Sequence, residues 1–478
     1  MTNTQGCSIW IIAGGIHRGA LRRWLFSWLD WGPGQSAQHR RLRRGGSDIL
    51  VSVTDTEDAA DTTPGPGFSR LSIGRWRQFE SIDLNFHPRL TVLTGANATG
   101  KSTILDILGL HFAWPVSYSA GPRQMGDDFG WSVSDSPVSP KAQMIVHSIS
   151  IGEIQYTNGQ SAEIILSQDT QLHHDRFDYT IQSELQKIPG TYIKSHRLVP
   201  QPYVSVPDIP NEFPNPEFLY ETYMAVLRAD YAKTGSYRGP RYSFKQVLIA
   251  SALFSEGNTY VEANANAAAI WKGFLHILRR VMPASLGFRQ LMVRGPHLVM
   301  ETDTGDFVID ESSGGVSAIL EMAWIIFLKS LAEQSFTVLI DEPENHLHPS
   351  LQREIMPNLL SAFPGAQFIV ATHSPFVATS SPESTVYALE YNSEHRVECH
   401  ELDYTNKAAS ADAALREILG VPSTLPIWAE QKYDEILAEY SSALISGESL
   451  KQLRSKLQAN GLDTEFPKAF LKLTDENQ

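Results

Sequence analysis

The sequence predicts an α/β protein with a mostly parallel central sheet. Three apolar segments, at 90–94, 337–340 and 367–371, read as buried strands. A glycine-rich loop and a helix follow the first, and a helix separates the other two. Strands that alternate with helices are typical of a parallel sheet, and strands buried on both faces appear as continuous apolar runs.

Shorter elements surround this expected core. Segments 70–79 and 82–86 read as two strands, the start of an N-terminal antiparallel β-subdomain. An insertion, helical in its second half, is expected at about 114–285. The remaining expected strands are 143–151, 162–166, 191–195, 291–293 and 298–301, and the remaining helices are 216–233, 243–280 with a break near Gly257, 312–331 and 350–362.

We divide the chain into a leader and linker at 1–67, a core domain at 68–405 and a helical C-terminal segment at 406–478. The first 46 residues hold seven Arg, one acidic residue and four of the ten Trp. This leader is either a basic arm for a membrane surface or nucleic acid, a disordered extension without a role, or the product of a wrong start site. Val51 and Val53 could be encoded by GTG start codons, and we favour the last two readings together.

Composition limits the classes of function. The 478 residues are 42% hydrophobic and 19% charged, an ordinary globular mixture, and the net charge of −14 does not favour general adhesion to nucleic acid. The two cysteines, Cys7 and Cys399, form no CxxC motif, which excludes a zinc hook or thioredoxin-type site and fits a reducing cytoplasm. We find no run of about 18 apolar residues, so no membrane domain is expected.

The loop at 95–103 has the pattern GxxxxGK[ST] between a strand and a helix. Successive backbone N–H groups and a helix N-terminus surround phosphate oxygens in this motif. Lys101 is expected to reach the β- and γ-phosphates of ATP, and the Ser102 hydroxyl to bind Mg²⁺. A chance glycine loop is the alternative. The expected phosphate-binding residues are Gly95, Ala96, Asn97, Ala98, Thr99, Gly100, Lys101, Ser102 and Thr103.

Two acidic residues end the apolar strand at 337–340. Asp341 is placed to hold Mg²⁺, usually through water, and Glu342 to act as a general base that polarises the attacking water. An apolar strand followed by Asp-Glu is common by itself. Its position 240 residues after Lys101 makes the pair a strong candidate.

Two further segments complete the expected site. Ser312, Ser313, Gly314 and Gly315 open an apolar helix and form a second phosphate-binding nest. One nucleotide does not need two such loops in one chain, so this loop is expected to serve the γ-phosphate held by another copy; a plain serine N-cap is the alternative. His373, at the end of the strand at 367–371, is expected to sense the γ-phosphate.

The ordered set 95–102, 312–315, Asp341 with Glu342, and His373 resembles the Walker A, signature, Walker B and switch-histidine elements of ABC-type P-loop ATPases. The SMC- and RecF-like branch fits best. The segments DEPENHLHP at 341–349 and ATHSP at 371–375 resemble AAA ATPases of the OLD-like group, many of which belong to bacterial anti-phage defence systems. The resemblance covers roughly 68–380. It places Asn97 in the phosphate loop, and Asn345, His346 and His348 in a dimer-facing loop.

The chain also departs from these families. Ala98 stands where many relatives have Gly, and Val316 stands where transporters have Gln. Gln124 is a guess for the lid glutamine, and Arg197 resembles a recurring Arg. The 210 residues between Ser102 and Ser312 show no sustained heptads, and the 105 residues after His373 contain no DxD. We therefore expect neither an SMC coiled coil nor a fused TOPRIM nuclease.

The resemblance implies an ATP-hydrolysing switch or sensor that forms an ATP-dependent homodimer and controls a separately encoded effector, a nuclease in the resembling defence families. ATP and Mg²⁺ are the expected cofactors. A RecF-like ATPase that binds DNA for repair is the alternative, and steep salt dependence of DNA binding would favour it. A nucleotide-binding scaffold with little turnover is the third hypothesis, and the intact Glu342 argues against it.

Overall fold

The structure is a computed structural model that describes residues 67–119, 121–125, 128–132, 148–169, 178–182, 185–195, 215–234, 238–402, 425–440 and 447–475. The leader expected at 1–67 lies outside the described residues except for Gly67.

A mostly parallel set of strands forms one half of a twelve-stranded sheet, as the sequence predicts. The order is β10-β14-β15-β3-β16, and all four neighbouring pairs are parallel. Every residue of β3, β10, β14 and β15 is buried, which explains their continuous apolar sequences. These strands are β3 (Leu90–Gly95), β10 (Gly190–Ile193), β14 (Phe336–Asp341), β15 (Ala366–Ala371) and β16 (Thr385–Tyr391).

The other half of the sheet is largely antiparallel and includes the predicted N-terminal strands. Its order is β17-β2-β1-β7-β8-β9-β4, and β17 joins the halves by pairing antiparallel with β16 and parallel with β2. In β2, buried and more exposed residues alternate, as expected for a strand with one covered face. These strands are β1 (Phe68–Ile73), β2 (Phe79–Asn85), β4 (Ser117–Ser119), β7 (Ser148–Tyr156), β8 (Ser161–Asp169), β9 (Asp178–Gln182) and β17 (Val397–Glu401).

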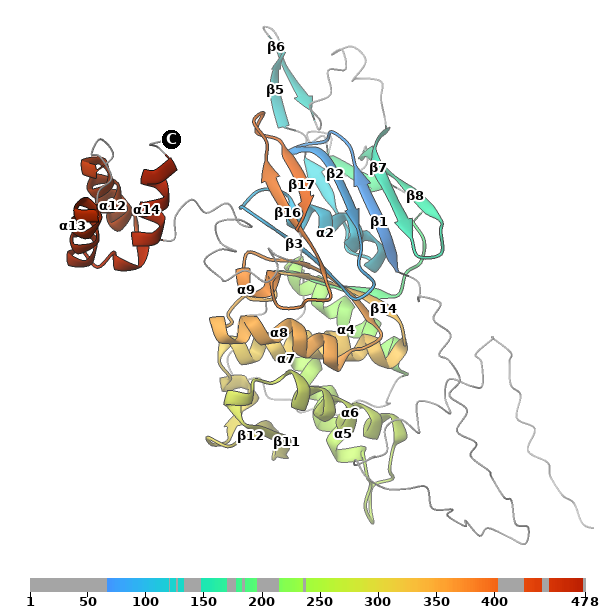
Figure 1. Ribbon diagram of the computed structural model, residues 1–478. Coiled ribbons are helices and arrows are strands. Elements are labelled where there is room, and N and C mark those ends of the chain that lie inside the picture. Colours follow the sequence, from blue (N-terminus) through green and yellow to red (C-terminus); the bar gives the residue numbers. More distant parts are fainter. Residues whose placement is uncertain are drawn as a thin grey trace, which may run out of the picture. The chain divides into compact units, whose positions relative to one another are not determined.

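Helices pack beside the parallel strands and on one another (Figure 1). The helix that follows β3 contacts β3, β14 and β15, and the long apolar helix α7 contacts α4, α6, β10 and β14. In the described part of the chain, α7 is the one helix long and apolar enough to cross a membrane, yet most of it is buried inside the protein. The helices are α2 (Lys101–Gly109), α4 (Pro216–Tyr231), α5 (Pro240–Phe254), α6 (Ala265–Val281), α7 (Gly314–Ala332), α8 (Pro349–Ala362) and α9 (Pro375–Ala378).

Small elements complete the fold. A two-stranded hairpin and a three-stranded antiparallel sheet do not pair with the large sheet. Three C-terminal helices bury their own cluster of apolar side chains, centred on Ile436, Leu453 and Leu457. The remaining elements are β5 (Gly121–Met125), β6 (Asp128–Ser132), β11 (Phe288–Arg294), β12 (His297–Thr302), β13 (Phe307–Val308), η1 (Leu110–Phe112), η2 (Ala284–Leu286), η3 (Ile309–Glu311), η4 (Asp463–Glu465), α12 (Ile427–Tyr440), α13 (Gly447–Ala459) and α14 (Phe466–Asp475).

The structure differs from the predicted elements at several places, including the following two. The strand expected at 70–79 ends at Ile73, and a tight turn with Arg77 at a positive φ of 50° leads into β2 at Phe79. Trp76 in this turn is fully buried. Because a buried apolar residue is also typical of a strand, the sequence predicted one strand that continues through the turn. Strand β10 lies inside the range expected to be an insertion, yet it pairs with β14 in the parallel core.

Candidate functional site

The glycine-rich loop connects β3 to α2 and requires glycine at both of its ends. Gly95 has a φ of 138°, and a Cβ added there would lie 2.3 Å from the carbonyl oxygen of Leu389. Gly100 has a φ of 94°, and its Cβ would lie 2.5 Å from the Gln78 side chain. Both conformations are rare for residues with a side chain. Ala98 adopts a φ of 63°, so the loop contains a strained position where many relatives have Gly.

Lys101 is the first residue of α2, and its ammonium group points back into the loop. Its Nζ donates hydrogen bonds of 2.8 Å to the carbonyl oxygens of Gly95 and Ala96. Burial lowers the pKa of Lys101 to about 8, an effect that the negative charges of Asp341, Glu342 and Glu344 oppose. The lysine therefore lies among three carboxylates at the end of β14, where an additional anionic phosphate would stabilise its charge.

The residues around the lysine alternate between exposed and buried. Ala96, Asn97, Ala98 and Ser102 are exposed, while Thr99 is fully buried and its hydroxyl donates to the Ala96 carbonyl at 3.0 Å. Thr103 is half-buried in the first turn of α2. The exposed backbone of the loop and the N-terminus of a nine-residue helix together present N–H groups to solvent, which is the arrangement that binds phosphate.

Glu342 follows β14 and is held by its neighbours in an uncommon backbone conformation. Its φ is 52°, in the left-handed region, and its N–H donates to the Ala371 carbonyl at 2.8 Å. The Asn345 amide donates to Glu342 Oε2 at 2.7 Å and to the Ser195 carbonyl at 3.0 Å. Such strain persists only where surrounding contacts impose it, and it is concentrated at functional sites. Asn345 lies in the loop after β14, and its side chain also contacts the candidate base.

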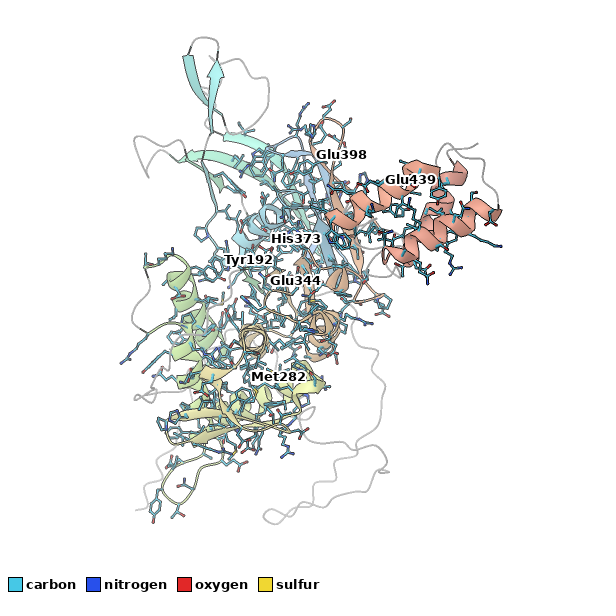
Figure 2. The ribbon with its side chains drawn as sticks, turned by 90° about the vertical axis from the view of Figure 1, so that its left-hand side faces the viewer. Tyr192, Met282, Glu344, His373, Glu398 and Glu439 are labelled. Carbon is cyan, nitrogen blue, oxygen red and sulfur yellow. The ribbon has the colours of Figure 1, made fainter. Side chains whose placement is uncertain are left out.

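Glu344 connects the loop after β14 to the segment after β15 (Figure 2). Its Oε1 accepts hydrogen bonds from the Thr372 hydroxyl at 2.8 Å and from the backbone N–H groups of His373 at 2.8 Å and Ser374 at 3.1 Å. Its Oε2 is buried without a hydrogen-bond partner. Burial raises the pKa of this carboxyl group, and hydrogen bonds from its own backbone, the Thr372 hydroxyl and the His373 N–H limit the rise.

His373 lies beside Glu342. Its Nε2 is 3.8 Å from Glu342 Oε1, and its side chain is 36% exposed. Burial lowers the pKa of His373, the charge of Lys101 lowers it further, and Glu342 acts in the opposite direction. The lowered pKa favours the neutral imidazole, which can form hydrogen bonds without carrying a charge.

The two serines of the serine–glycine segment, at the start of α7, differ in their exposure to solvent. Ser312 is buried, and its hydroxyl donates to the Ile309 carbonyl at 2.7 Å and lies 2.7 Å from the Ser317 hydroxyl. Ser313 is exposed and caps the helix by accepting from Val316 N at 3.4 Å. Of the two hydroxyls, only that of Ser313 faces solvent in this arrangement. The expectation that both serines meet phosphate therefore does not match the geometry of Ser312.

The loop after β14 contacts the serine–glycine segment within the same chain. A Cβ on Gly315 would lie 2.9 Å from the His346 carbonyl, and one on Gly314 would lie 3.6 Å from the His346 side chain. His346 is exposed at a φ of 67°, and His348 caps α8 by accepting from Ser350 N at 3.3 Å. One short loop thus begins with the candidate base Glu342 and contacts the serine–glycine segment through His346.

The donor set at the end of β14 fits Mg²⁺. A hydroxyl (Ser102) and a carboxylate (Asp341) are the hard oxygen ligands that this ion prefers, together with water and substrate phosphates. Among the described residues, no group of three or more His, Cys, Asp or Glu side chains forms a metal cage.

Two expected residues are not placed at this site, and three unexpected ones are. Arg197 lies outside the described residues, and Gln124 lies in the hairpin strand β5, where its backbone pairs with Phe129. Gln78, Tyr391 and Glu344 were not expected to contact the site. The Tyr391 hydroxyl donates to the Ala98 carbonyl at 2.9 Å, and the Gln78 amide lies over Gly100. Glu344 alone had a local signal, as the second Glu of the DEPENHLHP segment.

Two family models match this chain over segments that contain the site. Residues 70–195 match the model described as "AAA domain", and residues 234–379 match "AAA domain, putative AbiEii toxin, Type IV TA system". The chain contains an AAA domain with an ABC-type order of motifs. The first match includes the glycine-rich loop, and the second includes the serine–glycine segment, Glu342 and His373.

Curated relatives resemble parts of this AAA domain. The chain is 32% identical over 122 residues to the "Retron Ec83 probable ATPase" of Escherichia coli, covering 26% of this chain and 21% of the relative. It is 42% identical over 73 residues to the "Retron Vc95 probable ATPase" of Vibrio cholerae, covering 15% and 12%. It is 32% identical over 123 residues to the "Septu protein PtuA" of Bacillus mycoides, covering 25% and 17%. The matches span about a fifth or less of each relative.

Among solved structures, the SMC head domain from Thermotoga maritima aligns with 70% of this chain and 99% of that domain. The sequence identity is 12% and the TM-score is 0.36, a similarity too weak to support a statement about function.

Proposed function

We propose that this chain is an ATP-binding and ATP-hydrolysing switch whose nucleotide site is completed by a second copy. The observation that carries the proposal is the position of Glu342. Its carboxylate is held by Asn345, faces His373 at 3.8 Å and acts on the charge of Lys101. A lysine on a phosphate-binding loop next to a fixed carboxylate and a neutral histidine has the parts needed for phosphoryl transfer to water.

Each residue has a defined task in this mechanism. The N–H groups of the glycine-rich loop bind the β- and γ-phosphates, and Lys101 exchanges its bonds to the Gly95 and Ala96 carbonyls for the phosphate oxygens. Glu342 accepts a hydrogen bond from the attacking water and orients it, and His373 contacts the γ-phosphate. Ser102 and Asp341 would hold Mg²⁺, which supplies neutralisation of the phosphate charge when bound.

In this scheme each chain binds its nucleotide at the glycine-rich loop. The serine–glycine segment therefore meets a phosphate only when a second copy supplies it. Ser313 is exposed at the N-terminus of the 19-residue helix α7, whose backbone dipole favours an anion. In a two-fold dimer, Ser313, Gly314 and Gly315 of each copy meet the γ-phosphate bound by the other. ATP that binds only the assembled form stabilises that form by mass action.

The resemblance and the relatives support a proposal for the biological setting. The relatives include retron ATPases and a Septu protein, and the resembling OLD-like ATPases include members of anti-phage defence systems. We therefore place the switch in cytoplasmic antiviral defence, with a separately encoded nuclease as its effector.

ATP turnover and oligomeric mass test this proposal directly. We expect the wild-type protein to hydrolyse ATP and Glu342→Gln to accumulate an ATP-bound dimer, because substrate binding remains while water activation is lost. We expect Ser313→Arg to abolish both the dimer and turnover, since a large cation would occupy the shared interface. Turnover by a monomeric Ser313→Arg protein would show that the site is complete in one chain. Absence of both turnover and an ATP-dependent dimer would contradict the proposed switch as a whole.

A further inference from the structure

A buried ionic cluster lies immediately before the serine–glycine segment. Lys245 Nζ is 2.6 Å from Asp310 Oδ2, and the two side chains are 0% and 5% exposed. Arg241 Nε lies 3.7 Å from Asp310 Oδ1, with 14% of its side chain exposed. Arg241 and Lys245 are four residues apart in α5 and therefore lie on one face of that helix. We call these three residues the signature tether.

The signature tether is hydrogen-bonded to η3, the short helix that precedes α7. Arg241 Nη2 donates a hydrogen bond to the Ile309 carbonyl, and the Ser312 hydroxyl donates to the same oxygen at 2.7 Å. Ser312 in turn lies 2.7 Å from the Ser317 hydroxyl in the second turn of α7. A continuous chain of polar contacts thus runs from α5 through η3 to the segment that is expected to meet the partner's γ-phosphate.

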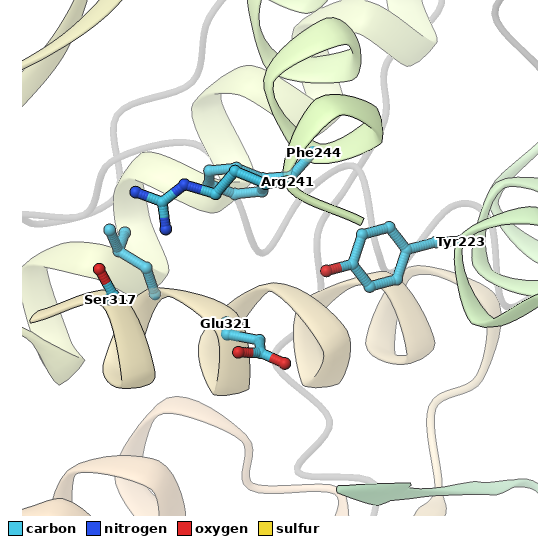
Figure 3. A pocket seen from close by; sticks show the side chains of 6 residues that line it. Tyr223, Arg241, Phe244, Ser317 and Glu321 are labelled. Atoms are coloured by element: carbon cyan, nitrogen blue, oxygen red, sulfur yellow. The ribbon is translucent and has the colours of Figure 1, made fainter. Parts of the chain in front are cut away.

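The tether reaches an open pocket between α4, α5 and α7 (Figure 3). Figure 3 shows Arg241 on the α5 side facing Ser317 and Glu321 on α7, with Tyr223 on the other side. Arg241 and Ser317 both line this pocket and both belong to the chain of contacts described above.

An ion pair buried to this extent is a poor means of adding stability. Removing two charges from water costs free energy that their attraction barely returns, and apolar residues of similar size would hold the helices together as well. What a buried pair does provide is a defined geometry, because one partner displaced from the other leaves an uncompensated charge. The tether lies at the junction where α5 meets the start of the signature helix, where defined geometry matters to the shared site.

We propose that Arg241 and Lys245 are positioning residues that act through Asp310 to hold the Ser313–Gly315 segment in the form that engages the partner's phosphate. This inference rests on the proposed function, because it assigns the tether to the step in which two copies meet. The three tether residues lie on α5 and η3, outside the glycine-rich loop and the loop after β14. Loss of the tether should therefore spare the binding of ATP to one chain and impair what depends on the second chain.

The experiment compares three properties of the full-length chain. ATP affinity of the single chain is measured with a fluorescent ATP analogue at low protein concentration. ATP-dependent dimer is measured by sedimentation in the Glu342→Gln background, and kcat is measured in the wild-type background. For Lys245→Met and for Arg241→Lys, which keeps the charge but shortens the reach to Ile309, we expect at least a tenfold loss of dimer and of kcat. Single-chain ATP affinity should change less than twofold.

Lys329→Met is the matched control. Lys329 is also a buried lysine, lies near the other end of α7, and its Nζ packs 4.8 Å from the centre of the Tyr220 ring. We expect this variant to dimerise and turn over ATP like the wild type. An equal loss in Lys329→Met would show that any buried lysine of this layer has the same effect, which would overturn the proposal.

A further variant separates positioning from folding. Arg241→Met, Lys245→Met and Asp310→Leu together remove the whole ionic cluster, a replacement that generally preserves stability, whereas loss of one partner can unfold the chain. With thermal melting in the wild-type range, we expect the triple variant still to bind ATP and to fail in dimer formation. A triple variant that dimerises like the wild type would refute the proposal. If the Glu342→Gln protein with an intact tether forms no ATP-dependent dimer, the proposed function fails instead.

Discussion

The Glu344 carboxylate accepts a hydrogen bond of 2.8 Å from the backbone N–H of His373. This contact joins two parallel neighbouring strands at their ends, because Glu344 follows β14 and His373 follows β15. Glu342, two residues before Glu344, is also the side chain that His373 faces. The same carboxylate therefore sets the relative position of the candidate base and the candidate γ-phosphate sensor without contacting either reacting group.

Substitution of Glu344 should change turnover more than ATP binding. Oε1 accepts three hydrogen bonds, while Oε2 has no hydrogen-bond partner, so the amide of Glu344→Gln can keep all three acceptor contacts. We expect kcat within about threefold of wild type for Glu344→Gln. Glu344→Ala loses three bonds to a buried acceptor, each worth about 1 kcal/mol, and should lower kcat by roughly 10- to 100-fold. Steady-state kinetics measure both values.

The split between kcat and KM is the decisive readout for Glu344. A loss confined to kcat indicates that His373 and Glu342 have moved relative to each other, whereas a rise in KM alone would indicate a damaged phosphate loop. Gln367→Leu is a suitable control. Gln367 also bridges backbone groups, those of Phe68, but near the start of β15, at the opposite end from His373. Wild-type kcat in Glu344→Ala would contradict the assigned role.

Local sequence patterns were sufficient to predict most of the core. The strand–loop–helix order around Lys101 and the apolar strands before Glu342 and His373 depend on neighbours in the chain, and these elements appear where the patterns place them. Strands β16 and β17 were missed although TVYALEY is an apolar run, because a Ser-rich segment precedes it and no motif follows it. The place of β10 in the core was not predictable either. Its partner for Thr191 is Val338, which lies in a distant part of the sequence.

The same distinction applies to the site. Lys101, Glu342 and His373 could be predicted as site residues because each ends or follows a recognisable element. Glu344 was missed because its partners lie 28 to 30 residues further along the chain, and the inward turn of Ser312 depends on Ser317 and Ile309. Motif matching indicates which residue types are present, whereas the bonds that hold them become visible only after the strands have paired.

ATP affinity should fall as pH rises above about 8. Burial lowers the pKa of Lys101 from 10.5 to about 8, so much of the free protein loses the ammonium charge above that pH. Phosphate binding requires this charge and must then take up a proton, which weakens binding by up to about tenfold per pH unit. Titration of the Glu342→Gln protein with ATP between pH 7 and 10 measures the slope. Lys101→Met should bind weakly with no comparable slope, and a flat profile in the parent protein would contradict the prediction.

Lys101 should also influence the pH dependence of stability in the absence of ATP. Because the pKa of Lys101 is lower in the folded than in the unfolded chain, unfolding takes up a proton between about pH 8 and 10.5. The cost of burying the charge is present in full below pH 8 and is relieved as the pH rises through this window. We therefore expect Lys101→Met to stabilise the protein against urea more at pH 7 than at pH 10. A stabilisation that is equal at both pH values would show that Lys101 titrates normally.

Two glycines with nearly the same φ separate strain from steric collision at the phosphate loop. Gly95 and Gly305 have φ values of 138° and 135°, but a Cβ on Gly95 would lie 2.3 Å from the Leu389 carbonyl oxygen, while one on Gly305 would meet nothing within 4 Å. Gly305→Ala should therefore cost only the conformational strain, about 1–3 kcal/mol. Gly95→Ala adds a collision with the backbone of β16 and should cost more. It should also weaken ATP binding, because β3 and β16 must move apart where the loop begins. Urea unfolding and ATP titration of both variants give the comparison, and equal losses of stability with unchanged ATP affinity would show that the contact between Gly95 and Leu389 does not shape the loop.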